Sequence, residues 1–155
     1  MEADQASPET LIRDVIVRVA APLIDSGRAA LELTPKGEYD PDSPASLELT
    51  PANPNACRLW IGTDVLGEAY VSMGNRGTHF EIWLSKDLDH FERYVEQIVI
   101  GVIEGKYEEW VHPDEERDKA FGTFRNVPDS RILHNLLWFP RRSRDSYEHI
   151  RYERY

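Results

Sequence analysis

The sequence has little cysteine, no basic leader and no long apolar run. Cys57 is the one cysteine in 155 residues, so an internal disulfide is excluded. The first four residues, Met1 to Asp4, carry acidic side chains where a secretory leader would be basic. No apolar run approaches the roughly 20 residues of a membrane-spanning helix. These absences predict a cytoplasmic protein that has no part in a membrane.

Several motifs of catalytic and cofactor sites are missing as well. Neither glycine-rich phosphate loop occurs, and the segment from Gly62 to Gly67 lacks the lysine and the helix that a P-loop needs. None of the five histidines stands three or four residues from another, which is the spacing of a helical metal site. A Gly-x-Ser-x-Gly elbow is also missing. We therefore expect no cofactor and no metal, and the sequence favours a function other than catalysis without deciding the question.

The charge is strongly acidic. The chain has 28 acidic against 18 basic residues, a formal net charge of −10. Such a charge repels a polyanion, so binding to nucleic acid is not expected. An acidic surface keeps a protein soluble and attracts a basic partner.

Apolar spacing of three and four residues predicts two main helices. The first begins at Ser7–Pro8, where serine can cap the helix and proline suits the first turn. Pro22 is expected to kink or end this helix, and Gly27 is a plausible stop. The second runs from a serine cap at Ser85 to Gly105 and has the most regular apolar stripe in the chain.

Short alternating segments predict strands. They cover residues 30–34, 46–50, 57–63, 68–73, 78–84, 107–112 and 120–127. The first two share the sequence Leu-Glu-Leu-Thr-Pro, and the pattern does not say whether they pair with each other. Segment 129–139 is open between helix and strand, and the tail 141–155 is expected to be partly ordered.

Short glycine-rich turns between the strands favour antiparallel pairing. We therefore predict one α+β domain over residues 1–155. It has a mostly antiparallel sheet of about five to seven strands, with two main helices packed on one face.

One cluster resembles a catalytic site. His79 and Glu81 would share a strand face with Trp83, which would place an imidazole and a carboxylate beside an aromatic wall. A pocket between the sheet and a helix could then serve a small enzyme or a small-molecule sensor, with Arg125 as an anion anchor. A solvated sheet face explains the same residues.

Two other groups of residues could contact a partner. If residues 107–112 and 120–127 form a hairpin, acidic side chains gather at one end of it: Glu108, Glu109, Asp114, Glu115, Glu116 and Asp118. The tail combines arginines with aromatic residues, which dominate binding hot spots: Trp138, Arg141, Arg142 and Tyr147.

The favoured hypothesis is a small acidic protein-binding module whose partner is another, basic protein. An immunity-type inhibitor of a basic toxin or enzyme is one such module, although a fold class does not establish a function. The alternative is the enzyme or sensor built on His79, Glu81 and Trp83. The sequence identifies neither the partner nor the oligomeric state, and a homodimer is compatible with both hypotheses.

Overall fold

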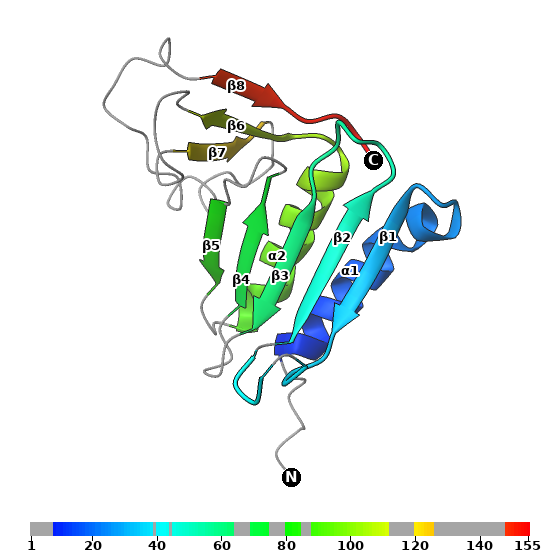
Figure 1. Ribbon diagram of the computed structural model, residues 1–155, viewed down its shortest axis with the longest axis vertical. Helices are drawn as coiled ribbons and strands as arrows, with labels where there is room; N and C mark the ends of the chain where they lie inside the picture. Colours follow the sequence, from blue (N-terminus) through cyan, green and yellow to red (C-terminus); the bar gives the residue numbers. More distant parts are fainter. Residues whose placement is uncertain are drawn as a thin grey trace.

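The architecture is that of an α+β protein with antiparallel pairing throughout its sheets. The computed structural model in Figure 1 describes residues 8–38, 40–43, 45–63, 69–74, 80–84, 88–111, 120–125 and 148–155. Within these ranges the helices are α1 (Pro8–Asp25) and α2 (Leu88–Ile103). The strands are β1 (Ala29–Thr34), β2 (Ser46–Pro51), β3 (Leu59–Thr63), β4 (Ala69–Met73), β5 (Phe80–Leu84), β6 (Tyr107–Val111), β7 (Ala120–Phe124) and β8 (Glu148–Arg151).

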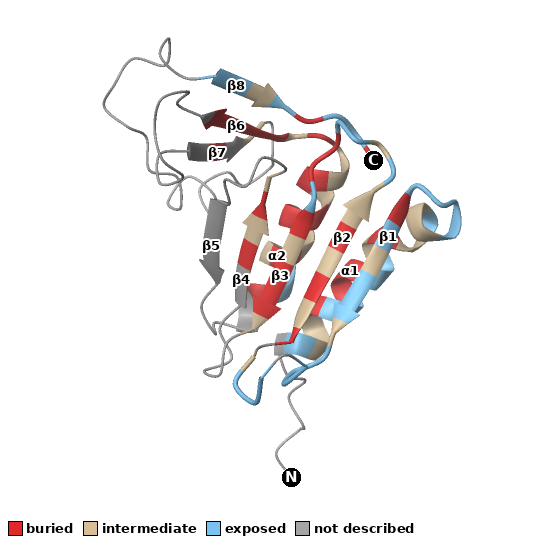
Figure 2. Cartoon of the chain, viewed as in Figure 1, coloured by how far each residue is buried: buried red, intermediate tan, exposed pale blue. Residues whose placement is uncertain are grey.

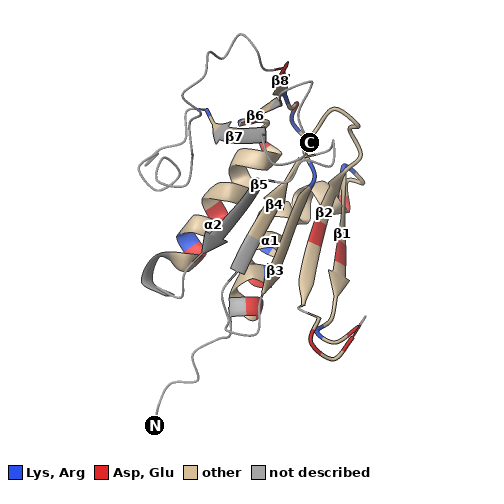
Figure 3. Cartoon of the chain, turned by 60° about the vertical axis from the view of Figure 1, so that its left-hand side comes forward, with Lys and Arg blue, Asp and Glu red and all other residues tan. Residues whose placement is uncertain are grey.

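The strands are divided between two sheets. The larger has the order β1-β2-β3-β4-β5 and the smaller the order β7-β6-β8, with every pair of strands antiparallel. The α+β class and the antiparallel pairing agree with the sequence prediction. The prediction of a single sheet differs from the structure, in which the described strands form two sheets. Both helices lie on one face of the larger sheet (Figures 1 and 3).

Helix α1 packs an apolar stripe on the sheet. Ile12, Val15 and Ile16 lie on this stripe and are at most 1% exposed. The helix does not end at Pro22 but continues to Asp25, because the missing proline N–H removes only one hydrogen bond of the last turn.

Gly27 ends α1 as the sequence indicates. Its φ of 72° lies in the left-handed region, which glycine adopts without steric cost. The chain then turns back, and Arg28 donates its backbone N–H to the carbonyl of Leu23 at 2.8 Å. This closing bond is typical of a helix that stops at a glycine.

Helix α2 adds five side chains to the described core. Its fully buried side chains are Phe91, Val95, Ile98, Val99 and Val102. Figure 2 shows the same pattern, with buried positions on the facing sides of the helices and the sheet. No helix in the described part of the chain combines the length and the apolar character needed to cross a membrane.

The two Leu-Glu-Leu-Thr segments are neighbouring strands. In the register of β1 with β2, Leu31 lies opposite Leu49 and Leu33 lies opposite Leu47. Leu47 and Leu49 are buried, but Leu33 is 53% exposed because β1 is the edge of the sheet. The glutamates between the leucines lie on the opposite face, which neither α1 nor α2 covers (Figures 1 and 3).

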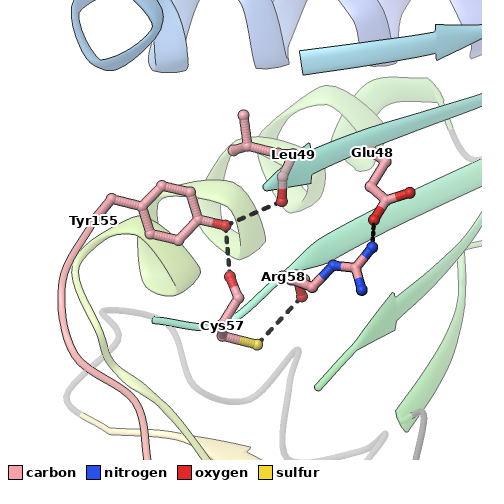
Figure 4. A network of polar contacts seen from close by, with 5 residues as sticks. All are labelled: Glu48, Leu49, Cys57, Arg58 and Tyr155. Atoms are coloured by element: carbon pink, nitrogen blue, oxygen red, sulfur yellow. Dashed lines mark hydrogen bonds and ion pairs between the residues drawn. The ribbon is translucent and has the colours of Figure 1, made fainter. Parts of the chain in front are cut away.

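The C-terminal residues tie the small sheet to the large one. Figure 4 shows the Tyr155 hydroxyl within hydrogen-bond distance of two carbonyl oxygens that accept from it: Leu49 O at 3.3 Å and Cys57 O at 2.5 Å. Burial raises the pKa of Tyr155 and of the Cys57 thiol. Cys57 is therefore a protonated core residue, as the sequence indicates, because a reactive cysteine needs a lowered pKa.

Candidate functional site

Of the catalytic candidates of the sequence, positions 81 and 83 lie on β5. His79 lies outside the described residues. In β5, Glu81 is the register partner of Ser72 and Trp83 that of Tyr70. A catalytic role for these residues stays a prediction.

Two residues of the predicted acidic patch are not on the surface. Strands β6 and β7 form the predicted hairpin, but Glu108 and Glu109 are only 6% and 1% exposed. Asp114, Glu115, Glu116 and Asp118 lie outside the described residues. Two of the six acids are therefore buried rather than exposed to solvent.

The described part of the tail is structured. Residues 148–151 form β8 on the edge of β6, and Tyr152 and Tyr155 are buried. The binding candidates Trp138, Arg141, Arg142 and Tyr147 lie outside the described residues.

Glu109 lies inside the core between two tyrosines. Its Oε1 accepts a hydrogen bond from the Tyr107 hydroxyl at 3.1 Å, and its Oε2 accepts one from the Tyr152 hydroxyl at 2.9 Å. Burial raises the pKa of Glu109 to about 7, although the two hydrogen bonds counteract this rise. The cluster joins β6 to the chain after β8.

Glu108 faces the other way and gathers three basic side chains. Its Oε2 lies 2.9 Å from His149 Nε2, 3.3 Å from Arg125 Nε and 3.5 Å from Arg151 Nε. The His149 ring is stacked on Trp110 with a centroid distance of 4.4 Å. One buried carboxylate therefore positions side chains from β8 and from the end of β7.

A cleft lies where the C-terminal residues meet the end of α2. Its volume is about 800 Å³, and we call it the C-terminal cleft. The lining residues are Arg28, Asn53, Glu104, Gly105, Lys106, Arg125, Tyr152, Glu153, Arg154 and Tyr155. Four of them are basic and two are acidic, which is the reverse of the charge balance of the whole chain.

An exposed acidic surface of the described structure lies on the β1–β2 hairpin. Within residues 29–51 the acids are Glu32, Glu38, Asp40, Asp42 and Glu48, and Lys36 is the one basic residue of that segment. We call this segment the acidic hairpin. Figure 3 shows its acids on both strands and in the connecting loop. Glu38, Asp40 and Asp42 are exposed, as is Glu32.

Hydrogen bonds hold the loop of the acidic hairpin in shape. The Asp40 Oδ1 accepts the backbone N–H of Asp42 at 2.9 Å, and the Asp40 carbonyl accepts the backbone N–H of Ser43 at 3.0 Å. Gly37, with a φ of 78°, donates its N–H to the Ser43 carbonyl at 3.0 Å. The acids of this loop thus project from an ordered turn.

The acidic hairpin borders an aromatic position on the open face of the sheet. Glu48 is the register partner of both Glu32 in β1 and Trp60 in β3. Trp60 is half-buried, and Arg58 forms an ion pair with Glu48 (Figure 4). The row continues with Ser72 in β4 and position 81 in β5.

Sequence reasoning missed that Glu109 points into the core and that Arg28 contacts Tyr155 in the C-terminal cleft. The first had a signal, because consecutive strand residues face opposite sides and two adjacent glutamates cannot both be exposed on a strand with one buried face. The second had none, since Arg28 reaches the main-chain oxygen of Tyr155 from 127 positions away.

The described residues contain no group of three His, Cys, Asp or Glu side chains arranged to hold a metal ion. Comparison of the chain with protein-family models, with curated proteins and with solved structures finds no match.

Proposed function

We propose that this protein is a protein-binding module that recognises a basic protein through the acidic hairpin and the adjoining open face of the sheet. The observation that carries the proposal is the concentration of five acids and one lysine in residues 29–51, of which four acids are exposed. A basic surface is the complement of such a patch, and the net charge of −10 adds long-range attraction.

The composition of the open face supports the same proposal. Trp60 stands next to Glu48 in the register, so a lysine or arginine of a partner can meet a carboxylate and an indole ring together. Aromatic residues surrounded by polar ones are typical of the centre of a binding interface.

An inhibitor of the immunity type would use such a surface to cover the basic substrate site of a toxin or enzyme. The ordered loop of the acidic hairpin favours this role, because acids that are already positioned lose little conformational entropy on binding.

Charge reversal tests the proposal directly. Three baits are compared in affinity capture from lysate of the source cell at low and at high salt: wild type, the double variant Glu38→Lys/Asp42→Lys, and Asp25→Lys. Asp25 is exposed at the end of α1, so its reversal changes the net charge outside the acidic hairpin. Each protein that is retained is then purified, and its affinity for the three baits is measured by calorimetry.

We expect a basic protein that binds wild type and Asp25→Lys, leaves at high salt, and loses at least about tenfold in affinity for the double variant, equivalent to about 1.4 kcal/mol. Equal affinity for the double variant and Asp25→Lys would exclude the acidic hairpin as the contact. Binding that does not depend on salt would contradict electrostatic recognition.

A further inference from the structure

We infer that the C-terminal cleft is a binding site for a small polyvalent anion that carries phosphate or carboxylate groups. Its basic lining residues are Arg28, Lys106, Arg125 and Arg154, and its volume of about 800 Å³ lies in the range of small-ligand sites. The cleft shares no residue with the acidic hairpin, and the inference does not depend on the proposed function.

The acids of the cleft already have partners. Glu104 lies 2.5 Å from the Lys106 ammonium group, and the Glu153 carboxylate accepts a hydrogen bond from Asn53 Nδ2 at 3.0 Å. Arg154 is exposed, and no described residue forms an ion pair with its guanidinium. Lys106 and Glu104 neutralise each other, and Arg28 already donates to the main-chain oxygen of Tyr155. The cleft therefore offers an anion the guanidinium of Arg154 and the remaining N–H donors of Arg28 and Arg125.

Arg125 is held in place for this role. Its Nη2 donates to the Gly105 carbonyl oxygen at 3.1 Å, and its Nε lies 3.3 Å from the buried Glu108 carboxylate. The side chain is nevertheless 40% exposed. Because a guanidinium has five N–H donors, an arginine anchored in this way keeps donors for a phosphate or carboxylate.

The hydrogen bond from Arg125 to the Gly105 carbonyl also reduces the negative charge that the end of α2 would present to an anion. The cleft includes the carboxyl end of α2, where unpaired carbonyl groups create a partial negative charge. Lys106 donates its backbone N–H to the Gly101 carbonyl at 2.8 Å, and Arg125 covers the Gly105 carbonyl. The helix end is thus largely neutralised before a ligand enters.

Buried contacts hold the wall of the cleft in place. Tyr152 lines the cleft and is bonded to the buried Glu109 at 2.9 Å. The main chain of residues 152–154 packs so closely on Gly105 that a Cβ there would lie 2.8 Å from the Glu153 carbonyl carbon. A positioned set of charges binds an anion with little loss of conformational freedom.

Titration with defined anions tests the inference. Pyrophosphate, citrate and inorganic phosphate are added to the full chain at low salt, and binding is followed by calorimetry and by the NMR signals of the arginine Nε–H groups. We expect saturable binding of pyrophosphate or citrate that shifts Arg125 and Arg154. A preference between these two probes assigns the ligand to phosphate or to carboxylate chemistry.

Two matched variants locate the site. Arg154→Gln removes a positive charge from the cleft, whereas Arg13→Gln removes one from an exposed position on α1. We expect about a tenfold loss of affinity for Arg154→Gln, which corresponds to about 1.4 kcal/mol, and little change for Arg13→Gln. Both arginines are exposed, so neither change threatens the fold.

Two results would overturn the inference. One is the lack of binding of all three anions to the wild type at about 10 mM, a concentration that detects even a millimolar dissociation constant. The other is equal weakening by Arg154→Gln and Arg13→Gln, which would show attraction by a diffuse field rather than by a site.

Discussion

The Tyr152 hydroxyl donates a hydrogen bond to Oε2 of Glu109 at 2.9 Å, and both groups are buried. Tyr152→Phe keeps the ring but leaves this carboxylate oxygen without its donor. We expect a loss of about 1–3 kcal/mol in the free energy of unfolding, because an unpaired buried polar group retains its desolvation penalty. Denaturant unfolding measures this loss. The same change in a Glu109→Leu background should cost much less, and an equal cost in both backgrounds would contradict the role of the hydrogen bond.

The raised pKa of Glu109 predicts a dependence of stability on pH. Its pKa is about 7 in the folded protein against an ordinary value of 4.5, and burial is the main cause. Between these values the folded protein holds a proton that the unfolded chain has released, so the free energy of unfolding falls as pH rises. The slope is at most about 1.4 kcal/mol per pH unit. The groups that face this carboxylate are Tyr107, Tyr152 and the Cys57 thiol.

Glu109→Gln isolates this contribution, since an amide does not titrate in this range. Relative to wild type, the variant should gain stability steadily from about pH 5 to pH 7 and show no further gain at higher pH. Unfolding of both proteins at several pH values measures the difference. Parallel pH profiles would show that Glu109 has the same pKa in the folded and the unfolded chain.

The helices could be predicted from the sequence because each packs one apolar stripe on a sheet, and that stripe is visible as a period. Strand alternation likewise identified the segments that became β1 and β2. It could not identify neighbours, because Leu47 and Leu49 show only which face of β2 is buried, whereas pairing depends on chain direction and on the turn.

The candidate site was harder to predict because it depends on contacts over long sequence distances. Glu108 meets His149 across 41 positions, and no local pattern encodes that distance. Strand β8 covers only four residues, which is too short for alternation to stand out, although Ile150 and Tyr152 face inward while His149 and Arg151 do not. The end of α1 also shows that a proline in the last turn of a helix is a weak stop signal.

Two glutamates oppose each other in the acidic hairpin, because the register places Glu32 directly across from Glu48. Glu48 has an ion pair with Arg58, and no described residue forms one with Glu32. Glu32→Thr removes the repulsion and adds a β-branched residue, so we expect a gain of about 0.2–1 kcal/mol in the free energy of unfolding. Denaturant unfolding at low salt checks the gain.

The matched control for this change is Glu38→Thr, which alters the net charge equally but lies in the loop without a cross-strand neighbour. We expect no comparable gain from it. Similar gains from both variants would assign the effect to the net charge rather than to the Glu32–Glu48 pair. If the proposed function is correct, we expect Glu32→Thr to weaken binding to the basic partner while it stabilises the fold, because it removes one exposed acid of the acidic hairpin.

Two glycines that follow helices allow the cost of backbone strain to be measured apart from the cost of close packing. Gly27 and Gly105 have φ angles of 72° and 68°, so alanine at either position meets the same unfavourable backbone conformation. A Cβ on Gly27 has nothing within 4 Å, whereas one on Gly105 would lie 2.9 Å from Arg154 N and 2.9 Å from Tyr152 O. These are main-chain atoms, which cannot rotate away as the tip of a side chain can.

We therefore expect Gly27→Ala to cost roughly 1–2 kcal/mol, the ordinary penalty for a left-handed residue with a Cβ. Gly105→Ala should cost a further 1–3 kcal/mol or so, because the C-terminal residues must move off the end of α2. Denaturant unfolding of the two variants measures the difference. Equal losses would mean that residues 152–154 shift at little cost, and the rigid wall of the C-terminal cleft would then be an incorrect description.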